Sequence, residues 1–289
     1  MQVTLEHVTH TYQPGSPFQA TAIRNVNLTI RSGEFLALIG HTGCGKSTLA
    51  QHINGLLKPT EGRVLLDGQD IHQKGFSKKE VRHKVGLVFQ YPEHQLFEET
   101  VAKDVGFGPK NLGLPEGEIA QRVQEALDKV GLSLPGLAEK SPFELSGGQM
   151  RRVAMAGVLA MRPEILVLDE PAAGLDPQSR EDMLQLISSL HRQGTTVVMI
   201  SHSMDDVARF ASRAVVMEHG TVVMEGAPEE IFRHPEELER MGLDVPSVCK
   251  LGMRLRAMGI ECPQDIFREE QAELALLSLW KGGAGHGAE

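Results

Sequence analysis

Two kinds of apolar pattern run along the chain, and they predict two kinds of β-strand. Residues 3–12 and 26–30 alternate apolar and polar side chains, which is typical of half-buried antiparallel strands. Other segments are continuous apolar runs, which are typical of parallel strands buried on both faces of a sheet. These runs are residues 35–39, 85–89, 165–168 and 196–200.

Helical patterns lie between the runs, around residues 118–130, 150–161 and 178–193. Strands that alternate with helices indicate an α/β core, and the alternating N-terminal strands indicate a small antiparallel sheet attached to it. Two hairpins are also predicted. Asp67-Gly68 suits the tight turn between two short strands, and residues 214–224 form the second hairpin.

The composition changes after about residue 235. Residues 236–280 have two open interpretations: a helical cap on the main core, or a docking surface for a second subunit. The glycine-rich residues 281–289 are expected to be a flexible tail. Four apolar side chains recur at intervals of three, four and three residues and predict an apolar stripe on one helix: Val248, Leu251, Leu255 and Met258.

Composition and charge exclude several classes of protein. The chain has 29 Lys and Arg against 38 Asp and Glu, so its net charge is −9, which argues against a broad nucleic-acid surface. The three cysteines have no metal-ligand or redox spacing, and their odd number fits a reducing cytoplasm. We expect no secretory signal, and no apolar run approaches the roughly 18 residues of a membrane span. Work at a membrane would therefore need a partner.

Residues 40–47 carry the strongest chemical signal. They read Gly-His-Thr-Gly-Cys-Gly-Lys-Ser and match the phosphate-binding pattern G-x-x-x-x-G-K-[ST] at every fixed position. An apolar strand precedes them and a helical pattern follows, so backbone N–H groups and a helix N-terminus converge on one anion. We expect Lys46 to reach the β- and γ-phosphates and the Ser47 hydroxyl to bind Mg²⁺. Cys44 occupies a variable position and is interpreted as a spacer; the alternative is a thiol against the phosphates, which would be open to alkylation.

Two carboxylates, Asp169 and Glu170, end one of the buried strands. In a P-loop fold the first acidic residue holds Mg²⁺, directly or through water. The second polarises the attacking water as general base. A solvated strand end is the plainer interpretation, but the four apolar residues before the pair and Pro171 after it argue against that.

Residues 145–149, Leu-Ser-Gly-Gly-Gln, precede a helical segment and form a second predicted anion site. Ser146 followed by two glycines suits a helix N-terminus, where backbone N–H groups point at an anion. One chain has little need for two γ-phosphate sites. We therefore expect this site to cover a nucleotide bound to another subunit.

With these features the chain resembles the ATP-binding-cassette (ABC) ATPases, because Leu145 to Gln149 is similar to the signature sequence of that family. The resemblance covers about residues 1–235 and implies a P-loop nucleotide-hydrolase core. It also implies a helical subdomain at about residues 91–160 and a head-to-tail dimer that holds two ATP molecules between phosphate loop and signature. Residues 236–280 would then be a helical dimerisation extension.

The resemblance also implies roles for single residues. Gln90 is placed like the Q-loop glutamine that contacts Mg²⁺ and the attacking water, and Asp176 like the D-loop aspartate. His202 is placed like the switch histidine that contacts the γ-phosphate. Tyr12 is placed like the aromatic that stacks on adenine, with His10 and Phe18 as nearby alternatives. The full predicted set is Glu170, His202 and Gln90 for catalysis; Tyr12, Gly40, His41, Thr42, Gly43, Cys44, Gly45, Lys46, Ser47 and Thr48 for the nucleotide; Leu145, Ser146, Gly147, Gly148 and Gln149 for the signature; Asp176 for the D-loop; and Ser47, Gln90 and Asp169 for Mg²⁺.

Residues 88–101, 107–113 and 141–144 are similar to the ATPase subunits of energy-coupling factor (ECF) transporters. That resemblance implies a second, similar ATPase chain, a membrane T subunit, and a substrate-binding S subunit specific for a vitamin or a transition-metal ion. It places the chain at the cytoplasmic face of the cell membrane, with no nucleic-acid partner. A groove would receive a coupling helix of the T subunit, and Leu96 and Phe97 are expected to be exposed there. The predicted groove residues are Tyr91, Gln95, Leu96 and Phe97.

Other functions stay open from the sequence. One is the ATPase of a conventional ABC transporter, and another is a soluble ABC protein that acts on ribosomes or DNA. A simple P-loop switch or kinase would not explain residues 145–149. The sequence is silent on the transported substrate, and a homodimer is the alternative to a pair of similar chains.

Overall fold

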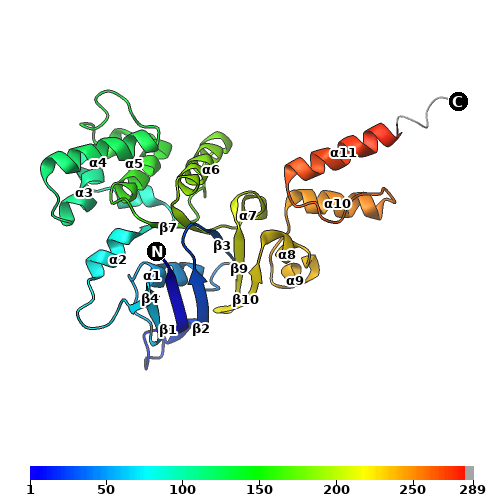
Figure 1. Ribbon diagram of the computed structural model, residues 1–289, viewed down its shortest axis with the longest axis horizontal. Coiled ribbons are helices and arrows are strands. Elements are labelled where there is room, and N and C mark those ends of the chain that lie inside the picture. The colour runs from blue at the N-terminus through cyan, green and yellow to red at the C-terminus, as the bar shows by residue number, and fades with distance from the viewer. Residues whose placement is uncertain (284–289) are drawn as a thin grey trace.

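Two β-sheets organise the computed structural model, which describes residues 1–283 (Figure 1). The four-stranded sheet has the order β2-β1-β4-β5 and is antiparallel. The six-stranded sheet has the order β10-β9-β3-β8-β7-β6 and is parallel except for the β9–β10 hairpin. The strands are β1 (Val3–Tyr12), β2 (Ala20–Ile30), β3 (Phe35–Ile39), β4 (Glu61–Leu66), β5 (Gln69–Asp70), β6 (Val85–Val88), β7 (Ile165–Asp169), β8 (Thr196–Ile200), β9 (Arg213–Glu218) and β10 (Thr221–Gly226).

The burial of the strands follows the apolar patterns. Every residue of β3, β7 and β8 is buried, as continuous apolar runs predict for strands covered on both faces. The turn between β4 and β5 has Asp67 at φ 49° and Gly68 at φ 82°, the left-handed conformations that a tight hairpin turn of this type requires. The predicted α/β fold with an attached antiparallel sheet is confirmed.

The helices form a cluster at one end of the molecule and a pair at the other. Figure 1 places α3, α4 and α5 together, and α10 and α11 at the opposite end. The helices are α1 (Lys46–Ile53), α2 (Lys78–Lys84), α3 (Val101–Asn111), α4 (Glu116–Lys129), α5 (Gly147–Leu159), α6 (Pro177–Arg192), α7 (Met204–Phe210), α8 (Pro228–Phe232), α9 (Pro235–Arg240), α10 (Ser247–Ala257) and α11 (Glu269–Gly283).

The predicted helical segments correspond to α1, α4, α5, α6, α10 and α11, but α3 was not predicted. Two glycines and Pro109 lie inside α3 and obscure its helical period. The helix begins at a side-chain cap, because the Thr100 hydroxyl accepts a hydrogen bond from the Lys103 N–H.

Small residues make up the buried face of α10. Cys249 and Gly252 are its buried residues, whereas Met258 is 75% exposed. The helix packs through small residues against the turn before α11, where the Cys249 thiol donates to the Ile266 carbonyl. Of the four-residue apolar stripe, Val248 packs against the small cluster of Ile266, Ala272 and Ala275, whereas Leu251 and Met258 are exposed.

Only the first part of the predicted tail, residues 281–289, lies in the described structure. α11 continues to Gly283, three residues into the segment 281–289. The rest of that segment, 284–289, lies outside the described residues. Across residues 1–283, no helix combines the length and the apolar character needed to cross a bilayer.

Candidate functional site

The predicted catalytic residues follow four neighbouring parallel strands. β3 leads into the phosphate loop, β6 into Gln90, β7 into Glu170 and β8 into His202. In the sheet these strands stand side by side in the order β3-β8-β7-β6. The carboxyl ends of parallel strands meet at one edge, which is where α/β sheets bind their ligands.

The phosphate loop requires glycine at two positions for steric reasons. A Cβ on Gly40 would stand 2.4 Å from the Met217 carbonyl oxygen, and a Cβ on Gly45 would stand 2.6 Å from that of Ala22. Both residues also have positive φ, 154° and 105°. The Lys46 ammonium donates to the carbonyls of Gly40 at 2.7 Å and His41 at 3.0 Å, so the lysine spans its own loop.

Cys44 does not face an open phosphate site, so the alternative of an alkylation-sensitive thiol against the phosphates is not supported. Its side chain is 1% exposed and belongs to the apolar cluster under the loop. The Sγ atom lies 3.8 Å from the Lys46 ammonium. The loop turns this side chain inward, because it is the backbone N–H groups of such a loop that point outward.

Asp169 is the buried carboxylate of the site, at 7% exposed. Burial raises its pKa, and the neighbouring Glu170 carboxylate raises it further, against the opposing effect of a hydrogen bond from Ser47 and the positive charge of Lys46. Ser47 and Asp169 therefore lie near each other, as expected for two residues predicted to hold one cation.

Glu170 is held between the other two predicted catalytic residues. Its Oε1 lies 2.8 Å from His202 Nε2, and its Oε2 accepts from the Gln90 amide at 3.3 Å. The backbone of Glu170 is left-handed, with φ 51°. Its N–H donates to the Ile200 carbonyl of β8, which fixes this turn against the neighbouring strand. A strained backbone conformation persists only where surrounding contacts maintain it. Here it fixes the direction of the Glu170 side chain.

The signature forms the exposed N-terminus of α5. Ser146 and Gln149 make a capping box, in which the serine hydroxyl accepts from the Gln149 N–H and the glutamine carbonyl accepts from the Ser146 N–H. A Cβ on Gly147 would meet nothing within 4 Å, so the backbone there is open. Asp176 similarly caps α6, and its hydrogen bonds with Ser179 hold its pKa below the usual range.

Tyr12 reaches the first turn of α1. Its hydroxyl lies 3.2 Å from the Thr48 hydroxyl, and its ring is 40% exposed. His10 packs edge-on against the same ring, and the fully buried His52 packs against His10. One part of the Tyr12 side chain is therefore exposed to solvent, and another part packs against His10. Phe18, the alternative aromatic residue, is 80% exposed.

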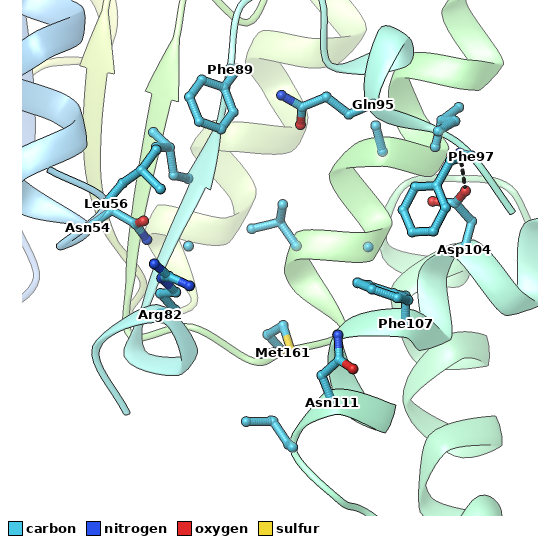
Figure 2. Close-up of a pocket in the computed structure, with 18 of the residues that line it drawn as sticks. Asn54, Leu56, Arg82, Phe89, Gln95, Phe97, Asp104, Phe107, Asn111 and Met161 are labelled. Carbon is cyan, nitrogen blue, oxygen red and sulfur yellow. Dashed lines mark hydrogen bonds between the residues drawn. The ribbon is translucent and has the colours of Figure 1, made fainter. Parts of the chain in front are cut away.

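A groove of about 640 Å³ is lined by residues of α2, β6, α3 and α5 and by the segment that carries Gln95 and Phe97. Figure 2 shows Leu56, Phe89 and Arg82 on one side of it and Phe97 and Phe107 on the other. The two phenyl rings meet edge to face at 4.9 Å.

Two of the four predicted groove residues need correction. Tyr91 lies outside the groove lining and instead stacks on His94 and stands near Gly174. Leu96 lines the groove but is 6% exposed, because its side chain packs into the main apolar core. Gln95 lines the groove, and Phe97 is exposed there as expected.

Arg151 is a residue that the sequence reasoning missed. It is 3% exposed on α5 and binds both carboxylate oxygens of Glu93, at 2.9 and 3.0 Å. It also donates to the carbonyls of Pro171 and Ala173, just after Glu170. Burial opposes the ionisation of Glu93, but Arg151 outweighs it and lowers the pKa of that carboxyl. An arginine within a helical pattern carries no signal of such contacts.

Comparison with known proteins decides the family. The profile of the ABC transporter family matches residues 23–173. The ECF transporter ATP-binding protein EcfA2 of Clostridium perfringens is 51% identical over 280 residues, 96% of this chain and 98% of the relative. This chain belongs to the ABC transporter family. EcfA2 of Clostridium tetani is 52% identical over 285 residues, 98% of this ABC ATPase and 99% of the relative.

Solved ABC structures agree with this assignment. The structure of cbiO1 from Clostridium perfringens, part of the ABC transporter complex cbiONQ, gives a TM-score of 0.71 at 37% identity and covers 89% of this chain and 96% of its own. The dimeric cassette MJ0796 bound to ADP and Pi gives 0.69 at 34% identity, covering 78% and 98%. The chain is an ABC-type ATPase and an ATP-binding subunit of the ECF type, so the resemblance found in the sequence is confirmed.

The buried His52 predicts a pH dependence of stability. Burial lowers its pKa from 6.5 to about 4, with His10 and His72 adding to the effect and the Thr48 carbonyl opposing it. Below pH 6.5 the His52 imidazole of the unfolded chain binds a proton, whereas that of the folded chain stays neutral until about pH 4. Stability is therefore lost as the pH falls from 6.5 towards 4. We expect the free energy of unfolding of wild type to fall between pH 7 and pH 5 by roughly 2 kcal/mol more than that of His52→Gln. Urea unfolding at the two pH values measures this difference.

The exposed His234 gives the matched control for that experiment, because its side chain is 54% exposed. His234→Gln should lose stability in parallel with wild type over the same pH range. Parallel curves for His52→Gln and wild type would show that His52 is not the group responsible.

Proposed function

We propose that this ABC ATPase hydrolyses Mg-ATP and couples the cycle to uptake of a vitamin or a transition-metal ion by an ECF transporter. The observation that carries the proposal is the position of Glu170, whose carboxylate contacts both Gln90 and His202 at the strand edge that bears the phosphate loop. A general base needs a positioned carboxylate that a neighbouring group orients, and both requirements are met here.

The residues next to the phosphate loop suit Mg²⁺. Mg²⁺ prefers hard oxygen ligands, often one or two carboxylates with the phosphates of the substrate. The Ser47 hydroxyl, the Asp169 carboxylate and the Gln90 amide oxygen are such ligands. Asp169 is buried with a raised pKa, and a cation would relieve that cost of ionisation. When bound, Mg²⁺ neutralises charge that develops on the phosphates.

The roles of the chain's own residues then follow from their positions. Backbone N–H groups of residues 40–47 bind the phosphates, and Lys46 exchanges its loop carbonyls for the β- and γ-phosphates. Glu170 orients the attacking water and accepts its proton. His202 Nε2 holds the Glu170 carboxylate. In the proposed cycle His202 also contacts the γ-phosphate from the same edge of the sheet.

A second ATPase subunit would complete each site. The signature helix presents Gly147 and an exposed Ser146 at its N-terminus, with open space in front of the Gly147 backbone. That arrangement binds an anion from outside the chain. We therefore propose a head-to-tail dimer, with a similar ECF ATPase or a second copy of this chain. The cassette MJ0796 is one relative whose solved structure is dimeric.

The groove supports the membrane part of the proposal. Asp104 accepts hydrogen bonds from the N–H groups of Phe97 and Glu98, both at 2.9 Å, so the loop that carries Phe97 is held in place (Figure 2). A preformed apolar groove of this size suits a short helix with apolar anchors. We propose that a T subunit supplies that helix, with an S subunit as its substrate-binding partner, and that this chain sits on the cytoplasmic face of the membrane.

Glu170→Gln tests the catalytic assignment. The amide cannot accept the proton of the attacking water, so turnover should fall by about 10²–10⁴ while ATP binding persists. ATP should then trap a dimer, measured by size exclusion with light scattering. Glu164→Gln, an exposed carboxylate at the other end of β7, is the matched control and should keep wild-type turnover. Near-normal hydrolysis by Glu170→Gln would overturn the base assignment.

Phe97→Ala tests the docking groove. Loss of a central aromatic anchor should weaken capture of the membrane subunit about tenfold or more in detergent pull-downs, without a change in ATP affinity. Phe18→Ala is the control, because Phe18 is 80% exposed and lies far from the groove in sequence. Equal recovery of the membrane subunit with both variants, or recovery of ribosomes or DNA instead, would contradict the proposed partner.

A further inference from the structure

Four residues of β1 and α1 contact one another in a closed circuit behind the exposed surface of Tyr12. The Tyr12 hydroxyl lies 3.2 Å from the Thr48 hydroxyl. The Thr48 carbonyl accepts a hydrogen bond from His52 Nδ1 at 2.7 Å. The His52 ring then meets His10 at 4.8 Å between centroids, and His10 meets Tyr12 at 4.6 Å and 78°.

The two imidazoles are fixed by backbone anchors rather than by solvent. A carbonyl oxygen only accepts, so Nδ1 carries the proton both in His52, which donates to Thr48, and in His10, which donates to the Lys58 carbonyl at 3.2 Å. His52 is fully buried, and His10 is 8% exposed. Imidazole rings that are buried and hydrogen-bonded in this way are held in one orientation. An aromatic ring packed edge to face against them is restricted in its own orientation.

Tyr12 needs such support because of where it lies. It is the last residue of β1, and the next residue, Gln13, has a left-handed backbone in the exposed loop that leads to β2. At this end β1 pairs with β2 through Tyr12 and Ala20, whereas its pairing with β4 ends at Thr9. Thr48 and His52, in contrast, lie one turn apart on α1, the helix that begins at Lys46 of the phosphate loop.

We propose that His10 and His52 are positioning residues for the base of ATP, which hold the Tyr12 ring at a fixed place relative to the phosphate loop. The inference rests on the proposed stacking of adenine on Tyr12. α1 then sets the separation between the ring that receives the base and the loop that receives the phosphates. Neither histidine touches the nucleotide, so both act through Tyr12.

The test compares a ligand that has a base with one that has none. ATP would contact both Tyr12 and the phosphate loop, whereas inorganic tripolyphosphate would contact the loop alone. His10→Ala should raise the Kd of ATP about two- to tenfold, the range expected for loss of one aromatic pair. The Kd of tripolyphosphate and the kcat at saturating ATP should not change. His10→Phe keeps an aromatic edge against Tyr12 and should restore most of the affinity.

Tyr12→Ala and the double variant separate the two proposals. Tyr12→Ala should raise the Kd of ATP about five- to hundredfold, as loss of a base-stacking ring does. Adding His10→Ala to Tyr12→Ala should cause no further loss. His7→Ala, on the exposed side of β1, is the matched control and should bind ATP like wild type. His52→Asn, whose amide can still donate to Thr48, tests the second ring by the same measurements.

Each other outcome has one meaning. An unchanged ATP affinity in Tyr12→Ala would overturn the proposed adenine platform itself. If Tyr12→Ala binds ATP more weakly but His10→Ala and His52→Asn bind it like wild type, only the positioning role would be overturned. Equal weakening of ATP and tripolyphosphate by His10→Ala, or a loss that persists without Tyr12, would show that the histidine acts through the fold of α1.

Discussion

The parallel pairing of β3, β8, β7 and β6 is the constraint on which the site depends. These strands are in register and almost wholly buried, so they cannot slide without exposing apolar side chains. Their carboxyl ends carry the phosphate loop, His202, Glu170 and Gln90, which are separated by up to about 160 residues along the chain. Hydrogen bonds between those side chains then fix what the sheet has brought together.

Arg151 connects that edge to the rest of the ATPase. Its guanidinium holds Glu93, three residues after Gln90, and the carbonyls that follow Glu170. The same helix begins at the signature, and the segment that contains Glu93 leads directly to the groove. A buried, bidentate ion pair of this kind is costly to break, since either charge alone would be left desolvated. The signature helix, the groove segment and the residues after Glu170 are therefore joined at one point.

The sequence predicted the site where spacing and strand ends determine it, and failed where side-chain direction decides. Gln90, Glu170 and His202 follow apolar runs typical of parallel strands, and the family resemblance assigned Gln90 and His202 to one site with Glu170. Leu96 was expected to be exposed because charged residues surround it in the sequence, but its side chain is buried in the main apolar core. Cys44 was placed against the phosphates because of its position in the loop, yet the loop geometry turns it inward. Arg151 gave no signal, because its partners lie 58 and 20 to 22 residues away in sequence.

The helix α7 connects the strand end that carries His202 to two other helices of the chain, α6 and α10. α7 begins two residues after His202, and its Asp206 pairs with Arg180 of α6, the helix that Asp176 caps. Burial raises the pKa of Asp206 despite this pairing, so the ion pair is held in a desolvated place. The adjacent Asp205 accepts from the N–H and hydroxyl of Ser247 at the start of α10. One short helix therefore carries attachments to both α6 and α10.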